Sequence, residues 1–451
     1  MSNNHERPDA VRSILNTLFV AVCLLAAPAR AADTPIAPDA LQADLRLLRA
    51  EIERIHPEPG LFVSRETLRL AYERIEAQFR QPMQRSQAWR TLATLNPLFA
   101  DAHMFVTQPD WRAATRAHVA AGGVLFPYEV QIDAAGAMTI LAGELAGARI
   151  ERINGVPAER VARELLDLMA GDTPALQANL LSRRFWLYYW QAYGAPQRFE
   201  LALGQGGQSR TVTVAGSAAL PSSVAEPTFA QTYGFELLPD KAALLTINQF
   251  QWPDPQAFYD FTNDAFTKIH AAGVTTLIID VRGNTGGNDD MWKSGILPYV
   301  ADKPARNGSS YIKKVIAGRA SGTEKVGDVV HGFGDTWVAP QPDNPLRFTG
   351  TTYVLVGRLT YSSAVLFSNV MQDFGFAKLV GARGYARTRQ TGGVVGVSLP
   401  NTGLEITIPR FVLDRPSGSR EAALVHPDIV LPDSPLDRRQ TIDALLARLR
   451  P

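Results

Sequence analysis

The chain has 451 residues, with 45 Lys and Arg against 44 Asp and Glu and a formal net charge of +1 at pH 7. This balance gives no bulk reason to expect a nucleic acid or an anionic membrane surface as a partner. The single cysteine, Cys23, lies in an apolar run near the N-terminus. A disulfide framework, a thiolate zinc site and a cysteine nucleophile are therefore excluded from the rest of the chain. The length predicts about two to three domains.

Residues 1–31 have the three parts of a secretory signal peptide. Arg7 and Arg12 precede the apolar run of residues 14–27, and the Ala-Arg-Ala of residues 29–31 supplies the small residues that a signal peptidase reads. A membrane anchor is the alternative, but the run is shorter than the ~20 residues that span a bilayer. We therefore expect an exported protein, periplasmic or extracellular, with no membrane span in the mature chain.

Residues 33–118 predict a small N-terminal helical domain. Apolar residues recur at three- and four-residue steps between Leu41 and Ile55, which is the spacing of one helix face. Two further helical runs follow at residues 68–79 and 89–95.

Residues 119–215 change to short β-like runs, followed by a strand that ends in an Asn154-Gly155 turn. A helix from about residue 158 to 170 comes next. This strand–turn–helix order resembles the core of a PDZ domain, which would bind an extended peptide end by strand addition. An unrelated α+β linker domain is the alternative.

Residues 226–451 alternate between strand and helix patterns, which predicts an α/β domain. Residues 243–247 are predicted to form a strand. Residues 276–280 and 353–356 are short, nearly continuous apolar runs, which are typical of buried strands. A helix is predicted from about residue 363 to 374.

The second of these strands runs directly into glycines, in the segment Asp-Val-Arg-Gly-Asn-Thr-Gly-Gly of residues 280–287. Such a loop presents backbone N–H groups without side-chain cover and can hold a phosphate or an oxyanion. The spacing matches neither a dinucleotide fingerprint nor a P-loop. A plain tight turn is the alternative.

The third strand leads through a short polar segment into a helix that starts with Ser362 and Ser363. A serine at a helix start usually serves as an N-cap. A nucleophile at a strand-to-helix turn would be exposed at the end of the sheet, near N–H groups and the positive helix end, which favour a developing oxyanion.

Together these segments resemble the tail-specific (C-terminal processing) protease family, including its tricorn-core relatives. The family pattern D-x-R-x-N-x-G-G is matched by residues 280–287, and T-x-S-[SA]-[AG]-E by residues 360–365, with Val365 in place of the Glu. Residues 421–429 match E-x-x-G-V-x-P-D-I with Leu for the Gly, and residues 101–103 match D-G-H with Ala for the Gly.

The resemblance implies a crotonase-like α/β catalytic core in which Ser362 is the nucleophile. It also implies an oxyanion hole built from the N–H of Ser363 and from a glycine of the glycine-rich loop, for which we favour Gly286. No metal or organic cofactor is implied.

The base is the point at which this chain departs from the bacterial processing enzymes, which use a Ser–Lys dyad. Arg387 occupies the position of the lysine, and a guanidinium stays protonated and cannot take the serine proton. The tricorn-core branch uses a histidine and a distal glutamate, which His103 and Glu421 match. The serine that bridges histidine and acid in that branch is replaced by Ala102, so the resemblance requires a direct or water-bridged contact between His103 and Glu421.

The sequence therefore predicts a signal peptide at 1–31, a helical domain at 33–118, a PDZ-like domain at 119–215 and a catalytic domain at 226–451. The predicted function is that of an exported serine peptidase that hydrolyses protein or peptide substrates through an acyl-enzyme on Ser362. Two alternatives stay open: a weak or inactive peptide- or ligand-binding protein on the same fold, and a serine hydrolase acting on esters or cell-wall peptides. The sequence says nothing of the oligomeric state.

Overall fold

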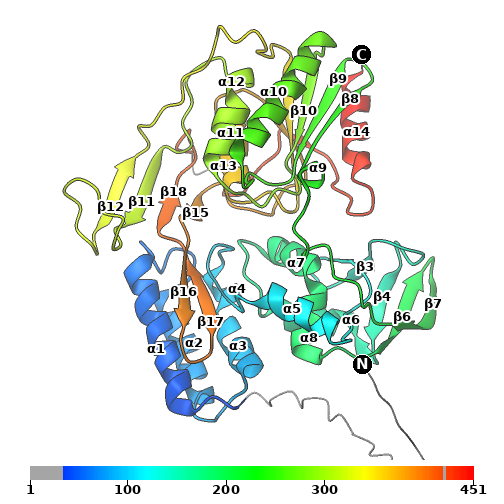
Figure 1. Cartoon of the computed structure of the whole chain (residues 1–451), viewed down its shortest axis with the longest axis vertical. Helices are drawn as coiled ribbons and strands as arrows, with labels where there is room; N and C mark the ends of the chain where they lie inside the picture. The colour runs from blue at the N-terminus through cyan, green and yellow to red at the C-terminus, as the bar shows by residue number, and fades with distance from the viewer. Residues whose placement is uncertain (1–33, 420–422, 451) are drawn as a thin grey trace, which may run out of the picture. The chain divides into compact units, whose positions relative to one another are not determined.

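The computed structural model describes residues 34–419 and 423–450 (Figure 1). The predicted signal peptide lies outside the described residues. The fold is mixed α/β with several sheets. None of the described helices is long and apolar enough to span a membrane.

Helices dominate the first described segment, as the apolar periodicity predicts. They are α1 (Pro38–Ile55), α2 (Arg65–Gln78), α3 (Arg85–Ala93) and α4 (Asn96–Phe99). The Ser64 side chain caps α2 by accepting a hydrogen bond from the Thr67 N–H. The face of α1 that carries Leu41, Leu48 and Ile52 is fully buried, so these helices are held by an apolar core rather than by helix propensity alone.

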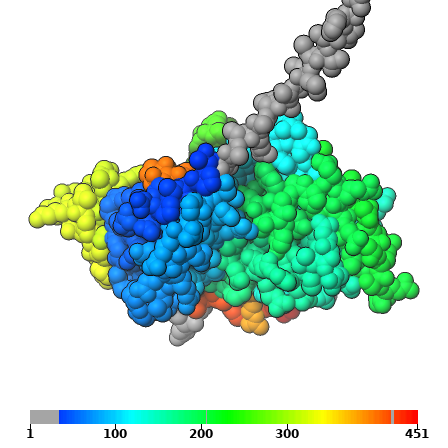
Figure 2. Space-filling view, turned by 90° about the horizontal axis from the view of Figure 1, so that it is seen from below, coloured from blue at the N-terminus to red at the C-terminus, as the bar shows by residue number. Residues whose placement is uncertain are grey.

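This helical core is completed by a hairpin from far along the chain. Strands β16 (Val395–Leu399) and β17 (Leu404–Ile408) form the hairpin, and β17 pairs antiparallel with β1 (Phe105–Thr107). Leu399, Leu404 and Ile406 are buried in the same cluster as the apolar face of α1. In Figure 2 the orange hairpin accordingly lies against the blue N-terminal helices. The pairing fixes the segment between α4 and β1, which contains His103.

The middle of the chain forms an antiparallel sheet with helices packed on it. Its strands run in the order β2-β3-β4-β6-β7, and β5 pairs with β4. The predicted turn is present, because Asn154 and Gly155 have φ of +49° and +79°. The elements are α5 (Trp111–Ala120), β2 (Val130–Ile132), β3 (Met138–Ile140), β4 (Arg149–Ile153), β5 (Val156–Pro157), α6 (Ala158–Leu166), α7 (Pro174–Arg183), α8 (Phe185–Tyr193), β6 (Arg198–Gln205) and β7 (Gln208–Ala215).

The last part of the chain is built on a six-stranded sheet in the order β19-β14-β13-β10-β9-β8. All neighbouring strands are parallel except β8 and β9. The strands are β8 (Tyr233–Leu238), β9 (Ala242–Ile247), β10 (Thr276–Asp280), β13 (Thr351–Val356), β14 (Lys378–Gly381) and β19 (Ile429–Val430).

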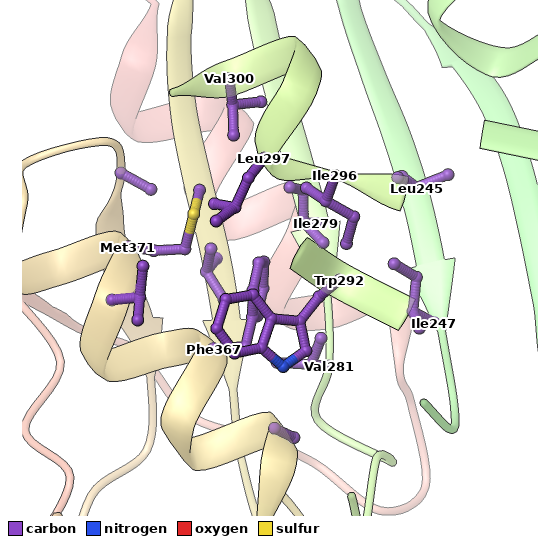
Figure 3. Close-up of a cluster of buried hydrophobic side chains, with 14 of the residues drawn as sticks. Leu245, Ile247, Ile279, Val281, Trp292, Ile296, Leu297, Val300, Phe367 and Met371 are labelled. Atoms are coloured by element: carbon purple, nitrogen blue, oxygen red, sulfur yellow. The ribbon is translucent and has the colours of Figure 1, made fainter. Parts of the chain in front are cut away.

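Helices cover both faces of this sheet, which explains why its strands read as continuous apolar runs. Leu245 and Ile279 point to one face, where they pack with Trp292 and Phe367 of the helices (Figure 3). Their neighbour Ile278 points to the opposite face, toward α14. The helices are α9 (Phe229–Thr232), α10 (Pro255–Ala271), α11 (Asp289–Gly295), α12 (Leu297–Val300), α13 (Ser363–Asp373) and α14 (Arg439–Leu449).

A second, antiparallel sheet belongs to the same part of the chain, in the order β12-β11-β18-β15. Its strands are β11 (Ser310–Lys314), β12 (Val329–Phe333), β15 (Gln390–Gly392) and β18 (Phe411–Leu413). This sheet matters for the site because β15 carries Thr391. The loops that follow β10 and β13 leave the same edge of the large parallel sheet, which brings the glycine-rich loop and Ser362 together.

Candidate active site

Ser362 occupies a strained turn between β13 and α13. Its φ and ψ are +53° and −126°, and its side chain makes no capping hydrogen bond although it stands at the N-cap position. A positive φ at a non-glycine residue costs about 1–3 kcal/mol and persists only where the surroundings enforce it. The turn before Ser362 is tied to the sheet by Thr360, whose hydroxyl accepts from the Gly357 N–H (2.9 Å) and donates to the Val281 carbonyl (2.8 Å).

The Ser362 hydroxyl points at His103, as the resemblance implied. Ser362 Oγ lies 2.9 Å from His103 Nε2, across 259 residues of sequence. The histidine sits in the loop between α4 and β1, where its own N–H donates to Asp101 Oδ1 (2.8 Å). The imidazole side chain is only 12% exposed, so the pair forms a largely buried hydrogen bond.

The other edge of the imidazole meets a hydroxyl and then a carboxylate. His103 Nδ1 lies 3.0 Å from Thr391 Oγ1, which in turn donates to Asp101 Oδ1 (2.9 Å). The direct distance from Nδ1 to Asp101 Oδ1 is 3.7 Å. The contacts at Asp101 Oδ1 and Thr391 Oγ1 are consistent with Nδ1 carrying the proton and donating to Thr391, while Asp101 Oδ2 is buried and has no hydrogen-bond partner among the described residues. That tautomer leaves the Nε2 lone pair facing Ser362.

A second carboxylate lies behind the first. The Tyr361 hydroxyl donates to Asp172 Oδ1 (2.8 Å), and it lies 3.3 Å from Asp101 Oδ1 and 3.2 Å from His103 Nδ1. Burial raises the pKa of Asp101, while burial and then the charge of Asp101 raise the pKa of Asp172. Burial and the two carboxylates also raise the pKa of Tyr361 well above its ordinary value, so this phenol is a fixed donor.

Arg387, at the position of the family lysine, is engaged elsewhere. Its guanidinium donates to the Ala100 carbonyl and stacks 4.0 Å above the ring of Phe62. Its backbone N–H donates to Asp172 Oδ2 (3.0 Å). The residue therefore ties the His103 loop and Asp172 together.

The glycine-rich loop lies directly against Ser362. Gly286 has φ of +107°, and a Cβ added to it would come within 2.6 Å of Ser362 Cβ and 3.0 Å of the Ser363 nitrogen. The loop is anchored by buried Arg282, whose Nη2 lies 2.8 Å from Asp280 Oδ2 and whose Nη1 donates to Thr441 Oγ1 (2.9 Å).

The backbone N–H groups of the predicted oxyanion hole differ in whether they already donate a hydrogen bond. The Gly286 N–H donates to Asn284 Oδ1 (2.8 Å). Within the described part of the chain, no hydrogen bond engages the N–H of Ser363 or of Gly287. The Ser363 hydroxyl is buried and bonded to Asp289 Oδ1 (2.5 Å), so its contribution to a site is limited to its backbone.

Residues 241–431 match the model of peptidase family S41. They form an S41 peptidase domain. The resemblance to the tail-specific proteases drawn from the sequence is thereby confirmed, although the branch within them stays a prediction. No curated protein is significantly similar to this chain.

Solved structures show the same fold at low sequence identity. Mature CPAF in complex with lactacystin is 17% identical, with a TM-score of 0.65, over 91% of this chain and 97% of CPAF. A second structure of mature CPAF gives a TM-score of 0.61 at 17% identity, over 91% and 96% of the two chains. At these identities the likeness concerns the fold alone.

The S41 peptidase domain thus contributes Ser362 and the glycine-rich loop, whereas His103 comes from the segment that precedes the family match. Three neighbours of His103 were not identified from the sequence as site residues: Thr391, Tyr361 and Asp172. Asp101 was part of the matched D-A-H triplet but had no assigned role. Glu421, the acid that the resemblance implied, lies outside the described residues and stays a prediction. No cluster of three or more potential metal ligands occurs within residues 34–419 and 423–450.

The pH dependence of the S41 site follows from the environment of His103. Burial lowers the pKa of its imidazole from 6.5 to about 4, partly opposed by Asp172. If the neutral imidazole acts as the base, kcat/KM should stay constant down to about pH 5 and fall only near pH 4. A pH profile of kcat/KM for peptide hydrolysis measures this, and a midpoint near 6.5 would contradict it. Asp101→Asn is the control, because burial raises the pKa of that carboxyl and its titration could also shape the acid side of the profile. If the fall of kcat/KM at low pH persists in the variant, it belongs to His103.

The same shift has a consequence for stability. The unfolded imidazole binds a proton at its ordinary pKa of 6.5 and the folded one only at about 4. The unfolded state therefore binds more protons between these values, so the contribution of His103 to stability is present above pH 6.5 and is lost as the pH falls toward about 4.

Proposed function

We propose that this chain is an exported serine peptidase that hydrolyses peptide bonds through an acyl-enzyme on Ser362. The observation that carries the proposal is the 2.9 Å contact between Ser362 Oγ and His103 Nε2, made by a serine whose backbone is held in a positive-φ turn. An N-cap serine would adopt ordinary β-region angles and bond to its own helix. This one does neither, which favours the nucleophile over the capping role.

The mechanism is acyl transfer. His103 Nε2 takes the Ser362 proton while Oγ attacks the peptide carbonyl, and the tetrahedral oxygen is held by backbone N–H groups. The Ser363 N–H and a glycine N–H of the loop supply these donors: Gly286 if its bond to Asn284 is shared, or the adjacent Gly287. The protonated imidazole then gives its proton to the departing amine, and a water molecule, deprotonated by the same nitrogen, releases the acyl group.

The described residues include a carboxylate and a bridging hydroxyl that could orient His103. We assign the bridging hydroxyl to Thr391 and the acid to Asp101, because the path from Nδ1 through Thr391 Oγ1 to Asp101 Oδ1 consists of contacts of 3.0 and 2.9 Å. In the tricorn-core branch a serine at the position of Ala102 bridges histidine and acid, and in this proposal Thr391 of β15 supplies that hydroxyl instead. Glu421 is the second candidate for the acid.

The architecture around the site supports the finer parts of the proposal. Catalytic loops that follow neighbouring parallel strands fit a crotonase-like core for residues 226–451. The sheet of residues 119–215, with α6 directly after the Asn154-Gly155 turn, fits a PDZ-like module. Residues 33–118 fit a helical domain, and export is supported by the sequence pattern of residues 1–31.

The carrier alternative is less well supported than the enzyme. A protein that only binds a ligand has no need of a strained serine that faces the free nitrogen of an oriented imidazole. The ester or cell-wall peptide alternative shares the mechanism and differs only in the groups that line the approach to Ser362.

The test is labelling of the mature protein with a fluorophosphonate probe, which reacts with activated serines. We expect one label, located on Ser362 by peptide mass spectrometry and absent from the Ser362→Ala variant. Ser368→Ala, which removes a buried serine of α13 whose hydroxyl donates to the Ala364 carbonyl, is the matched control and should label normally. A folded wild type that does not label would remove the support for the hydrolase and favour the carrier.

A further inference from the structure

A cavity of about 810 Å³ opens beside the catalytic loop. Thr285, Gly286 and Gly287 line one side, next to Gln251, Arg358 and Arg438. Residues of the 119–215 segment, the start of α5 and the loop of residues 221–227 complete the lining. Gly286 lies directly against Ser362, so the proposed nucleophile lies next to a peptide bound in the cavity. Its lining therefore bears on which peptides are accepted.

The charge of the lining is one-sided. Five arginines face the cavity and only one carboxylate does, Glu129. Two of the arginines are compensated by acids: Arg358 Nε lies 3.0 Å from Asp433 Oδ2 and Arg438 Nη2 lies 3.7 Å from Asp280 Oδ2. The other three are Arg112, Arg183 and Arg184, called the arginine trio below.

Within the described ranges, no member of the arginine trio has a carboxylate oxygen within 4.0 Å. Burial and the charges of its two partners lower the pKa of Arg183. Burial, Arg184 and Arg116 likewise lower the pKa of Arg112, against a weaker opposing effect of Glu226. The trio is thus a concentration of positive charge in which no member forms an ion pair with a described carboxylate, although Arg112 and Arg183 are exposed to solvent.

Ordinary structural roles do not account for this arrangement. Arg183 ends α7, where a cation is favoured by the helix dipole, but Arg112 lies in the first turn of α5, where a cation is disfavoured. Both Arg112 and Arg184 stack on the Trp111 ring, at 4.2 and 5.2 Å. Stacking fixes the guanidinium planes and leaves their N–H donors for a ligand.

We propose that the arginine trio is a specificity site that binds acidic side chains of the peptide substrate. Guanidinium groups pair with carboxylates through two parallel hydrogen bonds, and three of them exceed what one carboxylate can satisfy. A stretch with more than one Asp or Glu is therefore favoured over a single terminal carboxylate. The inference rests on the proposed peptidase function for its role in catalysis, but the binding step is independent of Ser362 chemistry.

The test measures binding in the Ser362→Ala background by fluorescence anisotropy. The probes are fluorescein-labelled Ala-Ala-Glu-Glu-Ala-Ala with an amidated C-terminus, its Gln-Gln counterpart with an amidated C-terminus, and the Gln-Gln counterpart with a free carboxylate. We expect the Glu-Glu peptide to bind about tenfold more tightly than either Gln-Gln peptide, and added salt to reduce the difference. Arg112→Gln and Arg183→Gln should each abolish most of it.

Arg210→Gln is the matched control, because Arg210 is exposed on β7 and lies outside the cavity. Circular dichroism melts establish that each variant is folded. Equal binding of the Glu-Glu and Gln-Gln peptides would overturn the proposal, as would a preference that follows the free C-terminus or one that survives loss of both Arg112 and Arg183. A charge preference that depends on these arginines, in a wild type that no fluorophosphonate labels, would refute the peptidase and leave the acidic-peptide site standing.

Discussion

Replacing His103 by Ala is expected to lower kcat/KM for hydrolysis of a dye-labelled unfolded casein by about 10⁴-fold or more. The imidazole is the only described group within hydrogen-bond distance of Ser362 Oγ, so it is the base that the described residues offer for the serine proton. Ser362→Ala should reduce the rate to the same floor, because nucleophile and base act as one unit. His270→Ala, at an exposed position of α10, should be neutral. A His103→Ala rate within tenfold of the wild type would refute the assignment of the base.

The same assay separates the two candidate acids. Asp101→Asn should lower kcat/KM by about 10²- to 10⁴-fold, because the imidazolium formed in the reaction loses its charge partner. Thr391→Val interrupts the same path at the hydroxyl and should have an effect in the same direction. If Glu421→Gln causes the loss and Asp101→Asn does not, the acid is Glu421 and Asp101 only holds the loop.

Gly286→Ala is expected to lower kcat/KM by about 10²-fold or more and to destabilise the fold by about 1–3 kcal/mol. The new methyl group would lie 2.6 Å from Ser362 Cβ and 3.0 Å from the Ser363 nitrogen, so either the loop or the nucleophile must move. The backbone would also have to keep φ of +107° with a side chain present. Hydrolysis rates and urea unfolding measure the two effects.

Gly273→Ala separates the effect of a positive φ at alanine from the effect of close contact with Ser362. Gly273 has φ of +60°, and an added Cβ would meet nothing within 4 Å. This control should lose stability by about 1–2 kcal/mol with kcat/KM unchanged. Equal effects of the two substitutions on activity would mean that the close approach of Gly286 to Ser362 has no part in catalysis.

The sequence alone determined the elements whose signals are local. The first helices follow from apolar spacing, the buried strands β9, β10 and β13 from apolar runs, and the Asn154-Gly155 turn from the two residues that tolerate positive φ. Ser362 could be singled out because its strand, turn and helix are contiguous. His103 could be proposed only through the resemblance, since a D-A-H triplet has no local signal of its own.

Tertiary structure alone decided what surrounds the histidine. Thr391 lies 288 residues beyond His103 and is brought to it by the second sheet, and Asp172 reaches Tyr361 across 189 residues. The engagement of the Gly286 N–H by Asn284 is also a matter of loop conformation that glycine spacing does not encode. Periodicity and turn chemistry act over a few residues, whereas these contacts depend on sheet register and on the packing of distant segments. Ser362 could therefore be proposed from the sequence itself and His103 from the resemblance, but the groups that contact the imidazole could not.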